Sequence, residues 1–373
     1  MHMRYPKFLK ENGTIGFVAP SFGCNIEPYR SAFENAQKKF KNLGYQVCLG
    51  PNCYAGEGIG ISNTPEKCGG ELTEGYVGRE SDCLISCGGG ELMCETLEYV
   101  DFEAIKQAEP KWYMGYSDNT NMTFLLATLC DTASVYGPCA AAFGMEPWHP
   151  ALQDAFDTFT GKSTGISSYE KWEKEGLKDE EHPLLPYNCT EESKAKIFVP
   201  EGKEIFALAD VQNMGRDSSQ KQKAVYGYVQ TEGAVIKGRL LGGCMDCLVN
   251  LTGTKFDKVK VFNEKYKEDG IIWFLEACDL NVFGIRRAMW QMEQAGWFEH
   301  VKGFLIGRPL CHGQEMMGLD QYGAVLYTAA KHGVPVIMDA DLGHLPPMMP
   351  MVTGAVAEIT VEDGKVYVQT QYK

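Results

Sequence analysis

Short apolar runs of strand length alternate with amphipathic segments of helical length through most of this chain of 373 residues. One such segment, residues 27–43, has apolar residues at helical spacing and ends before Gly44, a residue typical of helix ends. Alternation of this kind predicts an α/β fold with a mostly parallel sheet, covered on both faces and carrying functional groups at the carboxyl ends of its strands. The apolar runs in the first half are 14–21, 45–49, 83–87 and 112–114.

The second half repeats this alternation after a polar interruption. Residues 161–222 are rich in Glu, Lys and Ser, which is typical of linkers and surface loops. The tail at 355–370 is centred on Asp363-Gly364 and predicts a β-hairpin. We therefore expect an amino-terminal α/β domain at 1–160, a linker with surface loops at 161–222 and a second domain at 223–373. The strand-like runs of that second domain are 234–243, 270–276, 303–307 and 334–338.

Composition excludes several classes of protein. The chain carries 49 acidic and 35 basic residues, a net charge of −14, so no basic stripe is available for a nucleic acid polymer. No apolar stretch has the length of a signal peptide or a membrane span, which predicts a cytoplasmic protein without a membrane partner. Cysteines such as Cys83, Cys87 and Cys278 lie in apolar runs and are expected to be buried free thiols. Cys244-Met-Asp-Cys247 has no second pair at zinc-site spacing, and we expect neither metal nor cofactor.

The stretch Lys111-Trp-Tyr-Met-Gly-Tyr-Ser-Asp-Asn-Thr120 predicts a strand, a sharp turn and a helix start. Ser117 would then lie at the corner between strand and helix. A serine at such a corner exposes its hydroxyl, and backbone N–H groups of the following turn can stabilise an oxyanion. The alternative is a serine that only caps the helix. The pattern differs from G-x-S-x-G, because Asn119 occupies the second position after the serine.

The three glycines Gly88, Gly89 and Gly90 follow the predicted strand at 83–87. They do not fit a dinucleotide-binding fingerprint, because the third glycine of that fingerprint would fall at Met93. A glycine-rich strand end can bring a backbone N–H close to a reacting carbonyl without a side chain in the way. An ordinary tight turn is the alternative interpretation.

Two further residues, Glu276 and His344, share with Ser117 a position just beyond an apolar strand. A hydroxyl needs an imidazole to accept its proton, and the imidazole needs a carboxylate to orient it and stabilise its charge. The chain supplies one of each. For Glu276 the alternative is a salt bridge to Arg286 or Arg287, and for His344 it is a structural or capping role.

The order of these motifs resembles the LD-carboxypeptidases, a serine peptidase family that also contains the microcin C immunity carboxypeptidases. The resemblance ends in Gly343-His344 and Pro347, and it departs from the family at Tyr136 and Cys244, where histidine and asparagine are common. Its other quoted elements are Val18-Ala-Pro-Ser21, Gly88-Gly89, Gly115-Tyr-Ser-Asp118 with Thr120, Tyr136-Gly-Pro138, Gly238-Arg-Leu-Leu-Gly-Gly243, Leu251-Thr-Gly-Thr254, Phe274-Leu-Glu276 and Arg287.

The resemblance implies a flavodoxin-like amino-terminal domain, a smaller β-rich carboxy-terminal domain and an active site between them. It implies that Ser117 is the nucleophile, His344 the general base and Glu276 the residue that orients it. The backbone N–H groups of Gly89 and Asp118 would form the oxyanion hole. The substrate-binding residues that we expect are Gly88, Gly90 and, from its position in the polar segment, Trp172.

The resemblance also implies a small peptide substrate with a free carboxylate, and a homodimer. Murein tetrapeptide, cleaved in peptidoglycan recycling, is the first expected substrate, and a peptidyl-nucleotide of the microcin C kind is the alternative. A non-catalytic binding protein with the same fold is the competing hypothesis from another class.

Overall fold

A computed structural model describes residues 2–201 and 226–372. The chain divides into two compact units, each of which contains helices and a large sheet. This confirms the predicted two-domain α/β class. The first unit comprises Met1–Thr164, Glu173–Cys189 and Pro347–Gly354, and the second comprises Gly165–Trp172, Thr190–Pro346 and Ala355–Lys373.

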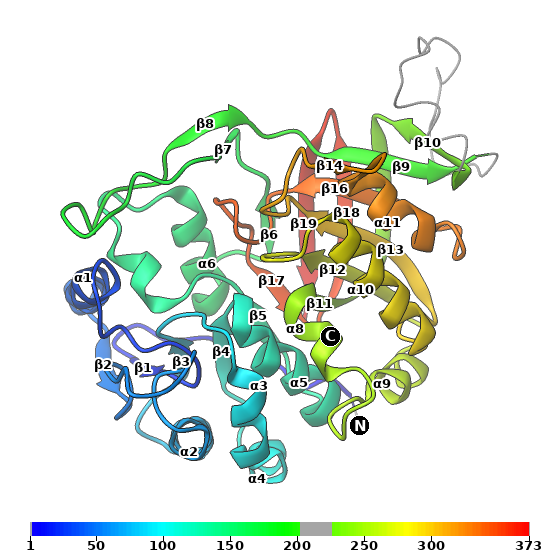
Figure 1. Cartoon of the computed structure of the whole chain (residues 1–373). Helices are drawn as coiled ribbons and strands as arrows, with labels where there is room; N and C mark the ends of the chain where they lie inside the picture. The colour runs from blue at the N-terminus through cyan, green and yellow to red at the C-terminus, as the bar shows by residue number, and fades with distance from the viewer. Residues whose placement is uncertain (1, 202–225, 373) are drawn as a thin grey trace. The chain divides into compact units, whose positions relative to one another are not determined.

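The first unit is built on a six-stranded sheet with the order β17-β5-β4-β3-β1-β2 (Figure 1). Strands β1 to β5 run parallel, as the alternation of strands and helices predicts, and only the edge strand β17 runs antiparallel, against β5. The carboxyl ends of the parallel strands therefore meet at one edge of the sheet. The strands are β1 Thr14–Val18, β2 Gln46–Leu49, β3 Cys83–Ser86, β4 Trp112–Gly115, β5 Ser134–Tyr136 and β17 Met351–Thr353.

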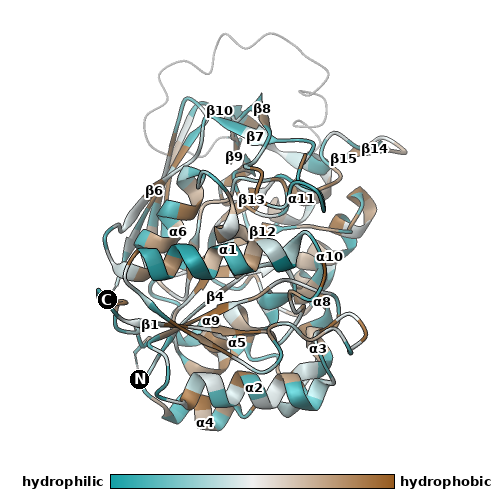
Figure 2. Ribbon diagram, turned by 90° about the vertical axis from the view of Figure 1, so that its left-hand side faces the viewer, coloured by the Kyte–Doolittle hydropathy of each residue, from teal (hydrophilic) through white to brown (hydrophobic). Residues whose placement is uncertain are grey.

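Helices cover both faces of this sheet (Figure 1). Helices α1 and α6 lie on one face, where Phe40 and Phe156 pack with ring centroids 5.5 Å apart. Helices α2, α4 and α5 lie on the other face and share a buried apolar cluster with β1, β3 and β4. Figure 2 shows hydrophilic residues along the outer face of α1. The helices are α1 Tyr29–Asn42, α2 Pro65–Val77, α3 Met93–Thr96, η1 Leu97–Tyr99, α4 Phe102–Gln107, η2 Ser117–Asn119, α5 Thr120–Cys130, η3 Ala140–Gly144 and α6 Pro150–Thr160.

The second unit contains a nine-stranded sheet with the order β10-β9-β16-β13-β12-β11-β18-β19-β6 (Figure 1). Its four central strands, β16, β13, β12 and β11, run parallel, and antiparallel strands extend the sheet on both sides. The carboxyl ends of β12, β13 and β16 are therefore neighbours. The strands are β6 Gly165–Ser167, β9 Lys196–Pro200, β10 Tyr228–Thr231, β11 Gly233–Cys244, β12 Ile271–Glu276, β13 Val301–Gly307, β16 Val336–Ala340, β18 Val356–Glu362 and β19 Lys365–Gln371.

The predicted carboxy-terminal hairpin is confirmed as β18 and β19. Asp363 and Gly364 connect the strands with φ angles of 51° and 76°, the left-handed backbone that a tight hairpin turn requires. The helices of this unit are α8 Met245–Leu251, α9 Val259–Lys265, α10 Val282–Gln294 and α11 Gln321–Ala329. A short hairpin, β14 Glu315–Met316 and β15 Leu319–Asp320, precedes α11.

Two parts of the structure differ from the expected division of the chain. Within 161–222, expected to be linker and loops, β6 and β9 join the nine-stranded sheet, and β7 Lys171–Glu173 pairs with β8 Cys189–Glu192. Residues 202–222 of this segment lie outside the described residues. The segment Pro347–Gly354, expected in the second domain, belongs to the first unit, because β17 pairs with β5.

No helix in the described ranges is both long enough and apolar enough to span a membrane.

Candidate active site

Ser117 follows β4 in a strained backbone conformation. Its φ angle is 61°, in the left-handed region that residues other than glycine rarely adopt. Its N–H donates to the Tyr136 hydroxyl at 3.2 Å. Helix η2 begins at Ser117 itself, and the cap positions of η2 and α5 are Tyr116 and Asn119. The capping interpretation of Ser117 is therefore wrong, and the strand-to-helix corner is confirmed.

The glycine turn after β3 packs directly against Ser117. A Cβ atom at Gly89 would lie 3.1 Å from the Ser117 Cβ and 3.2 Å from its Oγ. The turn is held in place through its carbonyl groups. Asn119 Nδ2 donates to the Gly88 oxygen at 2.8 Å, and the Phe22 N–H donates to the Gly89 oxygen at 2.9 Å. A side chain at Gly89 would therefore crowd Ser117, which would have to move by a few tenths of an ångström.

A Cβ at Gly90 would lie 2.3 Å from the Ser21 Oγ. Ser21 lies in the loop that follows β1, and its side chain therefore occupies the space that a side chain at position 90 would need. Gly90 thus has no room for a side chain, whereas Gly88, where a Cβ would lie 3.1 Å from Phe22, and Gly89 are packed tightly against their neighbours.

The carboxylate of Asp118 joins three segments of the first unit: the loop after β1, the start of α3 and the start of α5. Its Oδ2 accepts from the Ser21 hydroxyl at 2.5 Å and from the Met93 N–H at 2.9 Å, and its Oδ1 accepts from Asn121 Nδ2 at 3.1 Å. Asp118 is only 3% exposed, and burial raises the pKa of its carboxyl. The resemblance implies a role only for the backbone N–H of Asp118. The structural role of its carboxylate was not predicted. The motif Val18-Ala-Pro-Ser21 did mark the loop whose Ser21 donates to this carboxylate.

In the second unit, Glu276 and His344 form a hydrogen-bonded pair. His344 Nδ1 lies 2.8 Å from Glu276 Oε2, and the Glu276 side chain is fully buried at the end of β12. The predicted alternative, a salt bridge from Glu276 to Arg286 or Arg287, is wrong, because neither arginine forms one with it among the described residues. Arg286 donates to the Gly323 oxygen at 3.1 Å and lies over the Tyr327 ring at 3.6 Å.

Glycines also make this pair possible. Gly343 has a φ of 102°, and a Cβ there would lie 2.7 Å from Glu276 Oε2. A Cβ at Gly307, the last residue of β13, would lie 2.1 Å from the Leu342 oxygen and 3.1 Å from the Glu276 Cβ. The loop after β16 therefore crosses the end of β13 at close range, and His344 reaches the end of β12.

The surroundings of His344 make it a stronger base than a free imidazole. Burial alone would lower its pKa, but the charge of Glu276, together with hydrogen bonds to Cys278 and Glu276, raises the pKa well above 6.5. Cys278 was expected to be a buried thiol in an apolar run. Cys278 is a free thiol as predicted, but it is only half-buried and interacts with the imidazole, whereas Cys83 and Cys87 are buried as predicted.

Sequence reasoning also missed Arg308, the residue after β13. It is 1% exposed, it forms an ion pair with the buried Asp341, and its Nη1 donates to the Asp339 oxygen at 2.8 Å. These bonds hold the segment that leads from β16 to His344. The sequence marks Arg308 only as a charged residue just beyond an apolar strand, in Gly307-Arg308-Pro309.

Trp172 lies in the second unit and is 6% exposed. Its ring packs edge-on to His312 at 5.3 Å, and the Arg308 guanidinium lies 5.0 Å from its centroid. Contact between Trp172 and a substrate stays a prediction.

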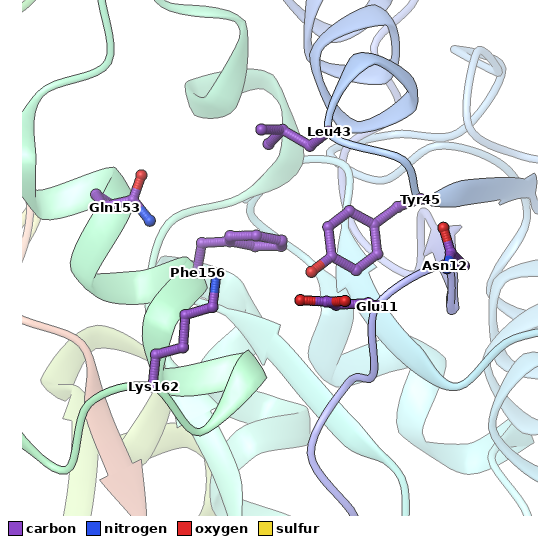
Figure 3. A pocket seen from close by; sticks show the side chains of 7 residues that line it. All are labelled: Glu11, Asn12, Leu43, Tyr45, Gln153, Phe156 and Lys162. Atoms are coloured by element: carbon purple, nitrogen blue, oxygen red, sulfur yellow. The ribbon is translucent and has the colours of Figure 1, made fainter.

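A cavity of about 240 Å³ lies in the first unit, and Figure 3 shows the side chains that line it. It is lined in part by Asn12 and Tyr45, which precede β1 and β2, so it lies at the amino ends of the parallel strands. Ser117 follows the carboxyl end of β4 and lies at the opposite edge of the same sheet. The cavity is therefore not part of the candidate active site.

Comparison with known proteins assigns the chain to a family. Among curated relatives, a protein of Treponema pallidum (strain Nichols) named "Putative carboxypeptidase" is 22% identical over 367 residues, covering 97% of this chain and 94% of the relative. A second relative of that description, from Streptomyces coelicolor, is 21% identical over 308 residues, covering 82% of this chain and 77% of its own.

Solved structures show the same fold. An MccF-like protein from Bacillus anthracis str. Ames has a TM-score of 0.76 at 20% identity, covering 99% of this chain and 100% of that one. The microcin C7 self immunity protein MccF, in complex with aspartyl sulfamoyl adenosine, has a TM-score of 0.74 at 18% identity, covering 98% of both chains.

The family model for the LD-carboxypeptidase N-terminal domain matches residues 15–137, and the model for the C-terminal domain matches residues 237–359. The first match contains Ser117 and the glycine turn, and the second contains Glu276 and His344. The chain belongs to the LD-carboxypeptidase family.

Proposed function

We propose that this protein is a serine carboxypeptidase that hydrolyses an amide bond next to a free carboxylate, with Ser117, His344 and Glu276 as its catalytic triad. The observation that carries the proposal is the 2.8 Å bond between His344 and the fully buried Glu276. A buried carboxylate paired with an imidazole orients the ring and stabilises its protonated form. The left-handed backbone of Ser117 beside a glycine turn supports the nucleophile assignment.

The proposed reaction starts when the Ser117 Oγ attacks the carbonyl carbon of the scissile amide and His344 Nε2 accepts the hydroxyl proton. His344 Nδ1 stays bonded to Glu276. The backbone N–H groups of Gly89 and Asp118 stabilise the negative oxygen of the tetrahedral intermediate. When the C–N bond breaks, His344 returns the proton to the leaving amine and an acyl-enzyme remains. Water, deprotonated by His344, then releases the acid product and restores Ser117.

For the substrate, we propose murein tetrapeptide, cut at its terminal D-alanine during peptidoglycan recycling in the cytoplasm. A peptidyl-nucleotide of the microcin C kind is the second candidate. MccF structures in complex with aspartyl sulfamoyl adenosine, glutamyl sulfamoyl guanosine and adenosine monophosphate support it, since they share this fold. We also expect a homodimer, which size-exclusion chromatography with light scattering would test.

A fluorophosphonate probe tests the nucleophile. Wild-type protein should be labelled and the Ser117→Ala variant should not. Incubation with murein tetrapeptide and with a peptidyl-adenylate analogue, followed by mass spectrometry, would then distinguish the two substrate classes. A wild-type protein that is neither labelled nor active on either substrate would support the non-catalytic binding protein instead.

A further inference from the structure

Asn119 occupies the position at which the turn after β4 departs from the G-x-S-x-G pattern, and its side chain is fully buried. A Cβ at Gly115 would lie 2.8 Å from the Asn119 Cβ, so the glycine before the serine makes room for this larger residue. The Tyr113 hydroxyl donates to Asn119 Oδ1 at 2.5 Å. Asn119 Nδ2 donates to the Gly88 oxygen at 2.8 Å and to the Tyr116 oxygen at 3.3 Å. A hydroxyl on one side and two carbonyl groups on the other therefore fix the orientation of the side-chain amide.

The bond to the Gly88 oxygen controls the peptide that carries the Gly89 N–H. The Gly88 carbonyl and the Gly89 N–H belong to one trans peptide unit, in which the two groups point in opposite directions. Because Asn119 holds the carbonyl toward itself, it also holds the N–H toward the opposite side. The Ser86 hydroxyl donates to the same carbonyl oxygen at 3.1 Å, so Asn119 makes the shorter of two bonds that fix this peptide.

The Gly89 N–H itself is available to a ligand. Within residues 2–201 and 226–372 it has no hydrogen-bond partner, whereas the Gly89 carbonyl accepts from the Phe22 N–H at 2.9 Å. A Cβ at Gly89 would lie 3.2 Å from the Ser117 Oγ, so this residue is a direct neighbour of the serine oxygen. Both carbonyl groups next to the N–H are bonded, and the donor is therefore oriented before any ligand arrives. Such a preorganised donor is what stabilisation of an oxyanion requires.

We propose that Asn119 is a positioning residue, which orients the Gly89 N–H toward the negative oxygen of the tetrahedral intermediate. The inference rests on the proposed serine carboxypeptidase function and adds the residue that sets one donor of its oxyanion hole. A donor held in place before the reaction needs no reorganisation when the oxygen becomes charged. Loss of Asn119 should therefore weaken stabilisation of the transition state and leave binding of the substrate unchanged.

The test compares Asn119→Ala with wild type in reaction rate and in binding of uncleaved substrate. The variant should lower kcat on murein tetrapeptide about 10- to 100-fold and leave KM nearly unchanged, because a donor displaced by about 1 Å loses most of its effect. The rate of labelling by the fluorophosphonate probe should fall by a similar factor, since the adduct also places an oxygen at the donor. In calorimetry, the tetrapeptide should bind Ser117→Ala and Ser117→Ala/Asn119→Ala equally well.

The matched control is Asn263→Ala in α9. Asn263 is also fully buried, and its Nδ2 donates to the Trp297 oxygen at 2.6 Å, so this variant loses a comparable bond that does not involve the glycine turn. It should keep the wild-type kcat and labelling rate, even where its Tm falls as far as that of Asn119→Ala. A second variant, Asn119→Asp, keeps the shape of the side chain and the bond from Tyr113 but replaces the donor by an oxygen. It should show the same losses, and it decides the question where Asn119→Ala does not fold.

Wild-type kcat and labelling in the Asn119 variants would overturn the inference. Weaker binding of the tetrapeptide to Ser117→Ala/Asn119→Ala, in proportion to the loss of kcat, would also overturn it, because Asn119 would then support the site as a whole. Absence of labelling in wild-type protein would instead refute the proposed serine mechanism. A crystal structure of the Asn119 variant then judges the positioning role by itself: a rotated peptide between Gly88 and Gly89 supports it, and an unchanged one overturns it.

Discussion

Glu276→Gln tests the charge on which the proposed triad depends. The substitution keeps the shape of a fully buried side chain that lies 2.8 Å from His344 Nδ1, but removes its negative charge. With charge centres about 4 Å apart and an effective dielectric constant of about 20, the lost attraction to the imidazolium is about 4 kcal/mol. At 1.36 kcal/mol for each factor of ten, the expected loss in kcat/KM is about 10³-fold.

The same substitution should also shift the pH dependence of kcat/KM in a defined direction. In wild type the pKa of His344 is raised above 6.5, so kcat/KM should increase with pH through that raised value, where His344 becomes the neutral base. Glu276→Gln removes a charge that raises this pKa, so the acidic limb should move to lower pH. The assay is steady-state kinetics from pH 5 to 9 on the substrate that mass spectrometry identifies.

The second unit offers a matched control, Glu293→Gln. Glu293 Oε2 lies 2.6 Å from His332 Nε2, in a second, partly exposed Glu–His pair that does not lie at a strand end. This variant should keep both the rate and the pH profile. A loss below tenfold in Glu276→Gln, or an acidic limb that stays in place or moves to higher pH, would refute the reasoning.

Four further predictions concern the parts around this pair. Ser117→Ala and His344→Ala should each cost about 10⁴-fold in kcat, and the double variant should be little worse than either; additive losses would argue against one catalytic unit. Ser21→Ala removes a 2.5 Å bond to the buried Asp118 carboxylate and should cost about 1–3 kcal/mol in urea unfolding, together with a lower kcat; unchanged stability would contradict this. Gly89→Ala should lower kcat at least about tenfold with little change in Tm, because its methyl group presses on Ser117; wild-type kcat would count against the packing argument. Cys278→Ala removes a smaller contribution to the raised pKa of His344, so the acidic limb should move to lower pH by less than in Glu276→Gln, and a larger move would be inconsistent.

Local patterns predicted the main elements of the fold because each of those elements carries its own signal. Apolar runs gave the central strands, Gly44 marked the end of α1 to within two residues, and Asp363-Gly364 identified the hairpin through its need for left-handed backbone. The positions of Ser117 and Glu276 at strand ends followed from the same runs.

Pairings between distant segments could not be predicted in this way. Strand β17 has three residues, lies far along the chain from β5 and has no alternating pattern, so nothing local marks its return to the first unit. Strands β6 and β9 are short and lie in or beside polar sequence, where composition favours loops. The partner of a buried charge, such as Asp341 for Arg308, could not be predicted either, because it depends on which loops the sheet brings together.

The proposed mechanism requires the Ser117 hydroxyl to lie next to the His344 imidazole. A crystal structure of the protein carrying a phosphonate adduct on Ser117 tests this most directly. The measured quantity is the distance from Ser117 Oγ to His344 Nε2. Catalysis by the proposed triad predicts about 3 Å. A separation well over about 10 Å, with the adduct in place, would contradict the account, because no proton could pass between the two groups in one step.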